Sequence, residues 1–278
     1  MDQVKELFRT HVEELLSIEK LSGGLSNDIY FINNKYIWKV FRNLYLIDHK
    51  NEVEVIKNIK EMNLYYNDNF NICFDYKIGF NIDKKYFLDN INVILQKLKD
   101  FHKLKIENVK NFWYDIVPLW ICQLPDDCKI CSKKELNLLY KHLTNILKNI
   151  SNEEDIVICH HDIHPGNIII FNDNIDFIDL EFSFKNYYFI DIANILCEVF
   201  TDYDNEIYTY NKINDNKIKS FIKMYNQKEN DLERIKVGIE ISHFYWMIWG
   251  LLINFKDKVS KFDYFKFAKA RYEFLPKL

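Results

Sequence analysis

Residues 156–182 read IVICHHDIHPGNIIIFNDNIDFIDLEF, and no other stretch of the chain is as informative. Short runs of β-branched and aromatic residues within it are typical of strands. These runs are 156–159, 168–171 and 175–178. The loop between the first two contains Pro165 and Gly166, and a chain with only 6 glycines and 4 prolines places them where the backbone must turn. The stretch therefore predicts a strand, a polar loop and a hairpin in succession.

Three oxygen-bearing side chains in this stretch have the spacing that phosphoryl transfer requires. Asp162 can accept a proton from a hydroxyl nucleophile, and Asn167 follows it five residues later with an amide oxygen. Asp179 stands at the end of the hairpin, and Mg²⁺ prefers oxygen ligands of these two kinds. An H-x-D motif followed by Asn, and then by Asp after a hairpin, is the layout of a kinase catalytic loop. We interpret Asp162 as the catalytic base and Asn167 and Asp179 as magnesium ligands.

Two other patterns have features of zinc sites. The histidines within 160–164 could be taken for a metal cluster, but zinc-binding histidine pairs usually lie on a helix, which Pro165 and Gly166 would break. Cys128 and Cys131 have the spacing of half a zinc site, but no second pair of cysteines or histidines follows at a suitable distance. We therefore expect no zinc, and free thiols at all 6 cysteines.

Strands crowd the first 80 residues, and helices dominate afterwards. Extended patterns cover 29–32, 36–41 and 70–80. Helical patterns cover the N-terminus (Val4, Leu7, Phe8, Val12, Leu15 and Leu16), 49–62, 88–104, 132–150 and the remainder from about Tyr187. Ser132 and Glu135 have the spacing of a capping box at the start of one helix. The pattern predicts an α+β, two-lobed fold. Together with the kinase-type loop it leads us to expect a protein-kinase-like fold, with an antiparallel sheet in a nucleotide-binding lobe (1–82) and a mostly helical catalytic lobe (83–278).

The N-terminal lobe contains candidates for binding the phosphates of ATP. Two adjacent glycines precede the first hairpin, so backbone amides and the polar side chains after them could cover phosphates. Lys39 lies mid-strand among apolar neighbours, and Glu52 in the following helix can pair with it and hold it on the phosphates. The alternative is an ordinary strand-edge lysine. The candidate set is Gly23, Gly24, Ser26, Asn27, Lys39 and Glu52.

The sequence resembles the choline/ethanolamine kinases, most closely the short bacterial type, within the aminoglycoside-phosphotransferase-like superfamily. The resemblance rests on four motifs in order, and it is specific in the second half and loose between about 60 and 130. LSGGLSN (21–27) resembles the family's G-G-x-[ST]-N motif, and CHHDIHPGN (159–167) its C-H-N-D-x-x-P-x-N loop. FIDLEFSFKNYYFIDIANILCE (177–198) is similar to I-D-F-E-Y followed by D-I-x-N-x-x-x-E, and HFYWMIWGLL (243–252) to the W-x-x-W helix.

The resemblance implies roles for individual residues. It implies Asp162 as catalytic base and Asn167 and Asp179 as magnesium ligands, as the spacing does. Lys39 falls where the family has a basic residue on the phosphates, and Asp191 matches a buried carboxylate that braces the catalytic loop. The role of Glu181 in the D-x-E motif stays open. Three departures, none removing a group needed for the chemistry, are His161 for Asn, Leu180 for Phe and Phe182 for Tyr.

A quaternary ammonium group cannot donate hydrogen bonds, so a selective site surrounds it with aromatic faces and a carboxylate at a distance. Trp246 and Trp249 are three residues apart and therefore share a helix face. The positions that the resemblance implies for this cage are Phe182, Glu198, Tyr203, Trp246, Trp249, Tyr264 and Phe267. The alternative is core packing, because the chain has 22 Phe, 18 Tyr and 5 Trp.

These observations predict a kinase that uses ATP and Mg²⁺ to phosphorylate the hydroxyl of choline. Ethanolamine, an aminoglycoside or another small alcohol are alternative acceptors, although the paired tryptophans argue against aminoglycosides, whose several ammonium groups call for many carboxylates. An inactive nucleotide-binding module and a scaffold protein are alternatives of other classes. The intact Asp162, Asn167 and Asp179 count against the inactive module.

Composition limits the partners. The 37 basic and 41 acidic residues give a net charge of −4, which argues against a general nucleic-acid binder. The longest nearly apolar run, 244–255, holds 12 residues, whereas a membrane span needs about 20. The charged N-terminus lacks the apolar core of a secretory signal. We expect a cytoplasmic protein with a small-molecule substrate and no membrane span, and the sequence leaves monomer or homodimer open.

Overall fold

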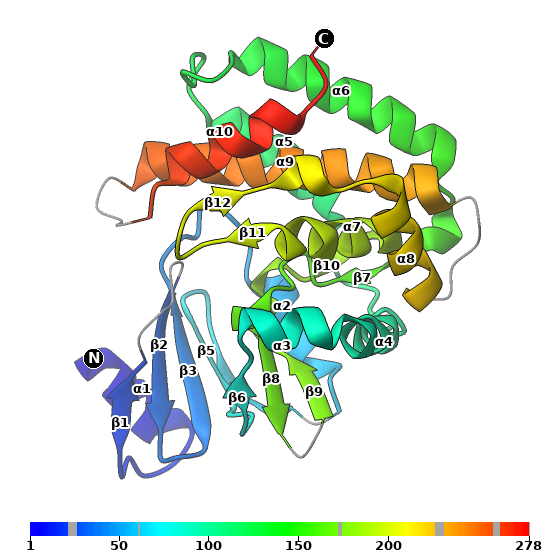
Figure 1. Cartoon of the computed structure of the whole chain (residues 1–278). Helices are drawn as coiled ribbons and strands as arrows, with labels where there is room; N and C mark the ends of the chain where they lie inside the picture. Colours follow the sequence, from blue (N-terminus) through cyan, green and yellow to red (C-terminus); the bar gives the residue numbers. More distant parts are fainter. Residues whose placement is uncertain (22–26, 61, 172–173, 226–230, 258–261, 278) are drawn as a thin grey trace. The chain divides into compact units, whose positions relative to one another are not determined.

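The computed structural model describes residues 1–21, 27–60, 62–171, 174–225, 231–257 and 262–277. The chain divides into two compact units (Figure 1). Unit 1 comprises 1–80, 106–109 and 179–183, and unit 2 comprises 81–105, 110–178 and 184–278. Unit 1 is thus built from three separate parts of the chain. The assignment of nucleotide binding to residues 1–82 and of catalysis to 83–278 stays a prediction.

Unit 1 contains a five-stranded antiparallel sheet in the order β1-β2-β3-β5-β4. Its elements are α1 (Asp2–His11), β1 (Ile18–Lys20), β2 (Asn27–Ile32), β3 (Tyr36–Phe41), α2 (Lys50–Lys57), β4 (Leu64–Asn67), β5 (Asn71–Asp75) and the 3₁₀ turn η4 (Leu180–Phe182). The predicted first hairpin is confirmed as β2 and β3. Its turn residues Asn33 and Asn34 have φ of 52° and 55°, the left-handed pair that suits a tight hairpin turn. The expected helix 49–62 is shorter, because it ends at Lys57.

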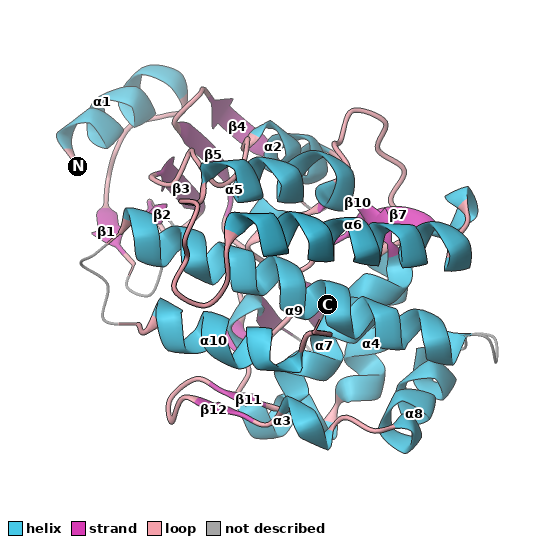
Figure 2. Cartoon of the chain, turned by 90° about the horizontal axis from the view of Figure 1, so that it is seen from above, coloured by secondary structure: helices cyan, strands magenta, loops and turns pink. Residues whose placement is uncertain are grey.

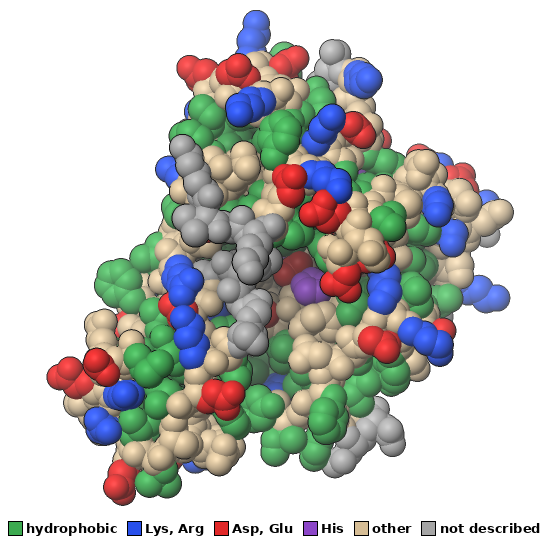
Figure 3. Space-filling view, turned by 60° about the vertical axis from the view of Figure 1, so that its left-hand side comes forward, with side chains coloured by type: hydrophobic (Ala, Val, Ile, Leu, Met, Phe, Trp, Pro, Cys, Tyr) green, Lys and Arg blue, Asp and Glu red, His purple; other side chains and the backbone are tan. Residues whose placement is uncertain are grey.

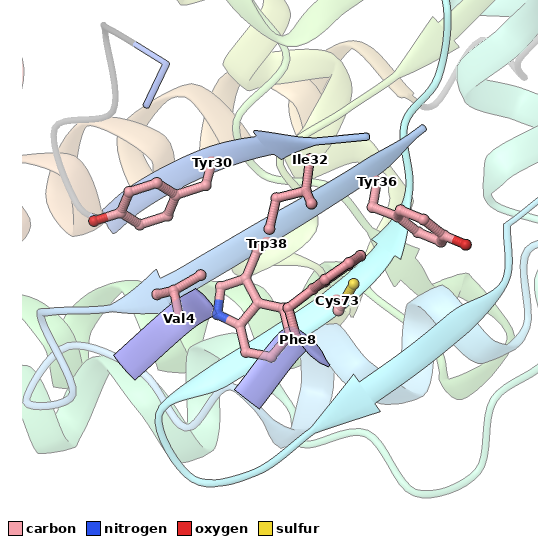
Figure 4. Close-up of a cluster of buried hydrophobic side chains, with 7 residues drawn as sticks. All are labelled: Val4, Phe8, Tyr30, Ile32, Tyr36, Trp38 and Cys73. Atoms are coloured by element: carbon pink, nitrogen blue, oxygen red, sulfur yellow. The ribbon is translucent and has the colours of Figure 1, made fainter. Parts of the chain in front are cut away.

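The core of unit 1 lies between α1 and the sheet (Figure 4). The Phe8 ring packs edge-on against the rings of Tyr36 and Trp38, with centroids 5.4 and 6.2 Å away. The predicted N-terminal helix therefore packs on the body, but it ends at His11, and Leu16 is 78% exposed. The Asn33 carboxamide explains the difference, because its Oδ1 accepts hydrogen bonds from the amides of Leu16 and Ser17 and holds them outside the helix.

Unit 2 is built mainly of helices. They are α3 (Lys84–Asp89), α4 (Ile91–Phe101), the π-helical η1 (Phe112–Ile116), α5 (Val117–Gln123), α6 (Lys133–Ile150), α7 (Tyr188–Val199), α8 (Asp215–Tyr225), α9 (Asp231–Lys256) and α10 (Tyr264–Phe274). The long helix α9 is in contact with α5, α6, α7, α8 and α10, and Figure 2 shows α6, α9 and α10 running side by side. The predicted capping box of Ser132 and Glu135 is confirmed at the start of α6.

Short strands and turns of unit 2 carry the predicted loop. The strands are β7 (Ile156–Cys159), β8 (Ile168–Phe171), β9 (Asn174–Phe177), β10 (Phe184–Tyr187), β11 (Thr201–Asp202) and β12 (Ile207–Tyr208), and β6 (Phe80–Asn81) lies where the chain passes from unit 1 to unit 2. The 3₁₀ turns are η2 (Glu153–Asp155), η3 (Pro165–Asn167) and η5 (Tyr210–Lys212). β7 pairs with β10, and β8 pairs with β9, which confirms the predicted strand and hairpin.

Three further predictions of secondary structure were wrong in extent. The single helix expected over 88–104 is two helices, α3 and α4, which meet at Asn90. The extended stretch 70–80 is interrupted between β5 and β6. The remainder from Tyr187 also contains the small hairpin β11–β12, which begins directly after α7.

The surface carries charges of both signs. Acidic and basic side chains alternate with hydrophobic ones over the face shown in Figure 3. Among the described helices, none has both the length and the apolar character that crossing a membrane requires.

Candidate active site

Lys39 is the centre of a charged cluster in unit 1. Its Nζ lies 2.9 Å from Glu52 Oε1, 2.8 Å from Asp179 Oδ1 and 3.4 Å from Glu181 Oε2. The predicted pairing of Lys39 with Glu52 is confirmed. Lys39 is 3% exposed on β3, which lies between β2 and β5, so it is not a strand-edge lysine.

Burial and charge shift the pKa values in this cluster. Burial alone would lower the pKa of Lys39, but Asp179, Glu52 and Glu181 outweigh it and hold that pKa well above its ordinary value. Burial, together with the charges of Asp179 and Glu52, raises the pKa of Glu181 to about 8, against the opposing effect of Lys39. Asn27 Nδ2 donates a hydrogen bond to Glu181 Oε2. Three carboxylates therefore share one ammonium group, and a proton or a cation is needed to balance them.

Asp179 is the member of this cluster that a metal ion can reach. Its side chain is 35% exposed, whereas those of Glu52 and Glu181 are 2% and 4% exposed. Its backbone has a φ of 58°, which a non-glycine residue rarely adopts, and it directly precedes η4. Gly23, Gly24 and Ser26, expected on the phosphates, lie outside the described residues.

In unit 2 the loop after β7 brings the predicted base and one predicted metal ligand together. Asn167 Nδ2 donates to Asp162 Oδ2 and to the Asp162 carbonyl, both at 2.9 Å. These bonds use the amide nitrogen of Asn167, and its oxygen, the atom type that magnesium prefers, takes no part in them. Burial raises the pKa of Asp162, but the neighbouring His164 and His160 outweigh it, so that pKa lies below its ordinary value. The carboxylate is therefore ionised at neutral pH, as a base must be.

Asp191 braces this loop, as predicted. Its Oδ2 accepts from the His160 amide at 2.8 Å, and its Oδ1 accepts from the His161 amide at 2.6 Å. His102 Nε2 lies 2.9 Å from the same Oδ2. His161 has a φ of 64°, so the carboxylate holds a left-handed backbone conformation at the residue before Asp162.

The histidines of this loop are engaged within the protein. His160 Nε2 lies 3.0 Å from the Ile178 carbonyl oxygen, and His161 Nε2 lies 2.8 Å from Asn186 Nδ2. His164 Nδ1 accepts from the Gly166 amide at 3.1 Å. Each ring nitrogen named here therefore has a protein partner, which accounts for the histidines as supports of the loop.

Four of the predicted cage residues meet where α9 packs on α10. The Trp249 ring packs edge-on against those of Trp246, Tyr264 and Phe267, with centroids 5.2, 5.3 and 5.9 Å away. These four side chains are at most 8% exposed, so they are also core residues, as the alternative held. Tyr203, just after β11, is 39% exposed. Phe182 is a buried residue of unit 1.

The ion pair between Glu198 and Arg271 was not predicted from the sequence. Arg271 Nη2 donates to Glu198 Oε1 at 2.9 Å, and the Tyr203 hydroxyl donates to Glu198 Oε2 at 2.6 Å. Arg271 follows Phe267 by four residues on α10, and this spacing on one helix face is the signal that could have found it.

A comparison with models of protein families matches residues 18–275 to the family described as choline/ethanolamine kinase. The chain belongs to the choline/ethanolamine kinase family.

Named members of the choline/ethanolamine kinases are distant in sequence and similar in fold. "Probable choline kinase 3" of Arabidopsis thaliana is 27% identical over 201 residues, which are 65% of this chain and 58% of the plant protein. "Probable ethanolamine kinase A" of Dictyostelium discoideum is 24% identical over 312 residues, covering 96% of this chain and 86% of the relative. The solved ethanolamine kinase of Plasmodium vivax superposes with a TM-score of 0.81 at 18% identity, covering 97% and 86% of the two chains.

The chain spans 57–58% of the length of the three Arabidopsis relatives that it matches. The Arabidopsis relative named for choline and the Dictyostelium relative named for ethanolamine match this chain at similar identity, 27% and 24%. The similarity therefore shows the choline/ethanolamine kinase family and its fold, and it does not separate the two amino alcohols.

Proposed function

We propose that this chain is a kinase that transfers the γ-phosphoryl group of ATP, with Mg²⁺, to the hydroxyl of choline. The observation that carries the proposal is the Asp162 carboxylate hydrogen-bonded to Asn167 in a loop that Asp191 braces. Membership of the choline/ethanolamine kinase family supports the same reaction class.

Each residue has a role in this reaction. Asp162 accepts the proton of the acceptor hydroxyl while the hydroxyl oxygen bonds to the γ-phosphorus of ATP. The bond from that phosphorus to the oxygen that bridges it to the β-phosphate breaks, and ADP leaves. Lys39, held by Glu52, stabilises the phosphate charge. Most of the rate enhancement then comes from positioning and electrostatics.

The cluster fits a divalent cation, because three carboxyl groups face one ammonium group and Asp179 is accessible. Asn167 in unit 2 and Asp179 in unit 1 are each proposed as magnesium ligands from their sequence spacing and from the resemblance, and Mg²⁺ would offset the negative charge of the phosphates. Gly23, Gly24, Ser26 and Asn27 are proposed on the nucleotide from the sequence, because adjacent glycines and polar residues precede the first hairpin, and from the resemblance.

Choline is the proposed acceptor because its trimethylammonium group suits aromatic faces. The rings of Trp246, Trp249, Tyr264 and Phe267 form one cluster. Tyr203 extends it through Phe262, whose ring centroid lies 6.3 Å from that of Tyr203 and 4.9 Å from that of Tyr264. Phe182 completes the proposed set. Ethanolamine is the second candidate acceptor, because a relative named as an ethanolamine kinase matches 96% of this chain.

The test measures ADP release from Mg-ATP with choline, ethanolamine, an aminoglycoside or no acceptor. We expect choline-dependent turnover that EDTA abolishes and that Asp162→Ala lowers to background without a change in the circular dichroism spectrum. Asp89→Ala is the matched control, because Asp89 is exposed and pairs with Lys85. Choline turnover unchanged in Asp162→Ala would refute the assigned base, and absence of turnover with every acceptor would refute the proposed function.

A further inference from the structure

Glu198 is the carboxylate of the proposed choline site, yet both of its oxygens are already occupied. Oε1 accepts from Arg271 at 2.9 Å and Oε2 accepts from Tyr203 at 2.6 Å. Glu198 is 2% exposed and Arg271 is fully buried. A ligand at the aromatic cluster therefore meets a carboxylate whose two oxygens are engaged and whose charge is paired with that of Arg271, and the Lys84 ammonium also donates a hydrogen bond to the Glu198 backbone carbonyl.

Arg271 is held in place by contacts with aromatic rings as well as by its ion pair with Glu198. Its guanidinium carbon lies 4.9 Å from the centroid of Tyr210 and 4.8 Å from that of Phe267, a cage residue. The planar group thus joins Glu198 to the aromatic cluster, an arrangement that an ammonium group could not reproduce.

The free energy of folding does not account for a buried arginine at position 271. Its Nε and Nη1 are buried and, among the described residues, lack hydrogen-bond partners. Unpaired buried donors cost free energy, and a buried ion pair is often no more stable than well-packed apolar residues of similar size. The arrangement is better explained by what it does to a bound cation.

The neutral pair of Glu198 and Arg271 should affect the binding of ethanolamine, a primary ammonium, and of choline, a quaternary ammonium, differently. A primary ammonium must give up its hydrogen bonds to water on entering the cluster, and a carboxylate with both oxygens engaged offers poor compensation. A trimethylammonium group has no such bonds to lose and is attracted by the ring faces.

We propose that Arg271 is a positioning residue that makes this site selective for quaternary over primary ammonium groups, by holding Glu198 in a neutral pair beside the aromatic cluster. The inference rests on the proposed function and deepens it, since it names the class of substrate that the site prefers. Removal of Arg271 frees Oε1 of Glu198 for N–H donors, and the negative charge of that carboxylate is then no longer paired with the arginine.

The experiment compares Arg271→Met with wild-type protein by two readouts. The first is the ratio of kcat/KM for choline to that for ethanolamine. The second needs no catalysis: it is the ratio of the affinities for tetramethylammonium and methylammonium, measured by calorimetry. We expect Arg271→Met to lower both ratios about tenfold or more, since methylammonium and ethanolamine gain a charged acceptor.

Two further variants complete the design. Lys266→Met, also on α10, removes an exposed lysine that pairs with Glu206, and should leave both ratios unchanged. The double variant Glu198→Gln/Arg271→Met replaces one neutral pair by another, so its ratios should stay within about threefold of wild type. If Arg271→Met fails to fold, Arg271→Gln takes its place, because the glutamine amide can still donate a hydrogen bond to Glu198 while the positive charge is removed, and both ratios should again fall about tenfold.

The outcomes separate the inference from the proposed function. Ratios in Arg271→Met within twofold of wild type would overturn the inference, as would a double variant whose ratios fall tenfold. Failure of the proposed function gives a different result, in which wild-type protein binds tetramethylammonium but phosphorylates neither amino alcohol.

Discussion

Replacement of Asp191 by Asn tests whether one carboxylate holds the catalytic loop. The carboxylate accepts two backbone amides, those of His160 and His161, and also contacts His102. Asn keeps one acceptor oxygen for His160 and His102, but its NH₂ group then faces the His161 amide. The variant loses a charge-assisted hydrogen bond and leaves a buried donor unpaired, which costs about 2–4 kcal/mol in the free energy of unfolding. That is a large share of a typical stability of about 5–15 kcal/mol.

The assay is urea denaturation at pH 7, followed by far-UV circular dichroism, with ADP release measured on the same samples. We expect turnover to fall as well, because Asp162 directly follows the left-handed His161. Burial raises the pKa of Asp191, but His102 and the loop histidines outweigh it and hold that pKa below its ordinary value. The contribution of the Asp191 carboxylate to the free energy of unfolding is therefore present above about pH 4 and is lost as the pH falls further. The difference in free energy of unfolding between wild type and Asp191→Asn should therefore shrink in acid.

Asp89→Asn is the matched control for Asp191→Asn, because Asp89 is 60% exposed and forms an exposed pair with Lys85. Its free energy of unfolding should change by less than about 1 kcal/mol. The reasoning is refuted if Asp191→Asn is no less stable than this control, or if its turnover is normal.

Two further predictions concern the Lys39 cluster. Lys39→Met should lower turnover at least about a hundredfold and lower the free energy of unfolding by about 3–5 kcal/mol at pH 7, because Glu52, Asp179 and Glu181 lose their buried partner. ADP release measures the turnover, and urea denaturation measures the free energy of unfolding. Wild-type values in both assays would contradict the role assigned to Lys39. Glu181→Gln should gain stability relative to wild type as the pH rises from about 4.5 to 8, because folded wild-type protein keeps a proton that the unfolded chain releases. Urea denaturation without ligands at pH 5 and pH 8 checks this, and a difference that is the same at both pH values would show that Glu181 is ionised throughout.

The sequence predicted those features whose information lies in neighbouring residues. The hairpin of β2 and β3, the capping box of α6 and the loop around Asp162 all follow from adjacent side chains. Helix limits were less accurate. The apolar periodicity of 88–104 runs across Asn90, so it does not show the break between α3 and α4. The strands β11 and β12 have only two residues each, too few for a recognisable alternation.

Contacts between distant parts of the chain could be predicted only where a reaction requires them. The pairing of Lys39 with Glu52 was predicted on that ground. The contact of Lys39 with Asp179 joins residues 140 positions apart, and Arg271 and Glu198 are 73 positions apart. Such pairs depend on how helices and strands pack. Spacing along the sequence puts Arg271 on the same helix face as Phe267, but it does not identify Glu198 as its partner.

The segment 179–183 has a consequence for how unit 1 forms during synthesis. These residues supply Asp179 and Glu181 to the Lys39 cluster, but they follow residue 80 by about a hundred positions. At a translation rate of about 5–20 residues per second, roughly 5–20 seconds pass before they are made. During that interval the ribosome-bound sheet holds Lys39 with Glu52 but without its two later partners. An N-terminal fragment ending near residue 80 therefore holds Lys39 in a balanced pair with Glu52, and the unit gains its excess of carboxyl groups only after the catalytic loop has been translated.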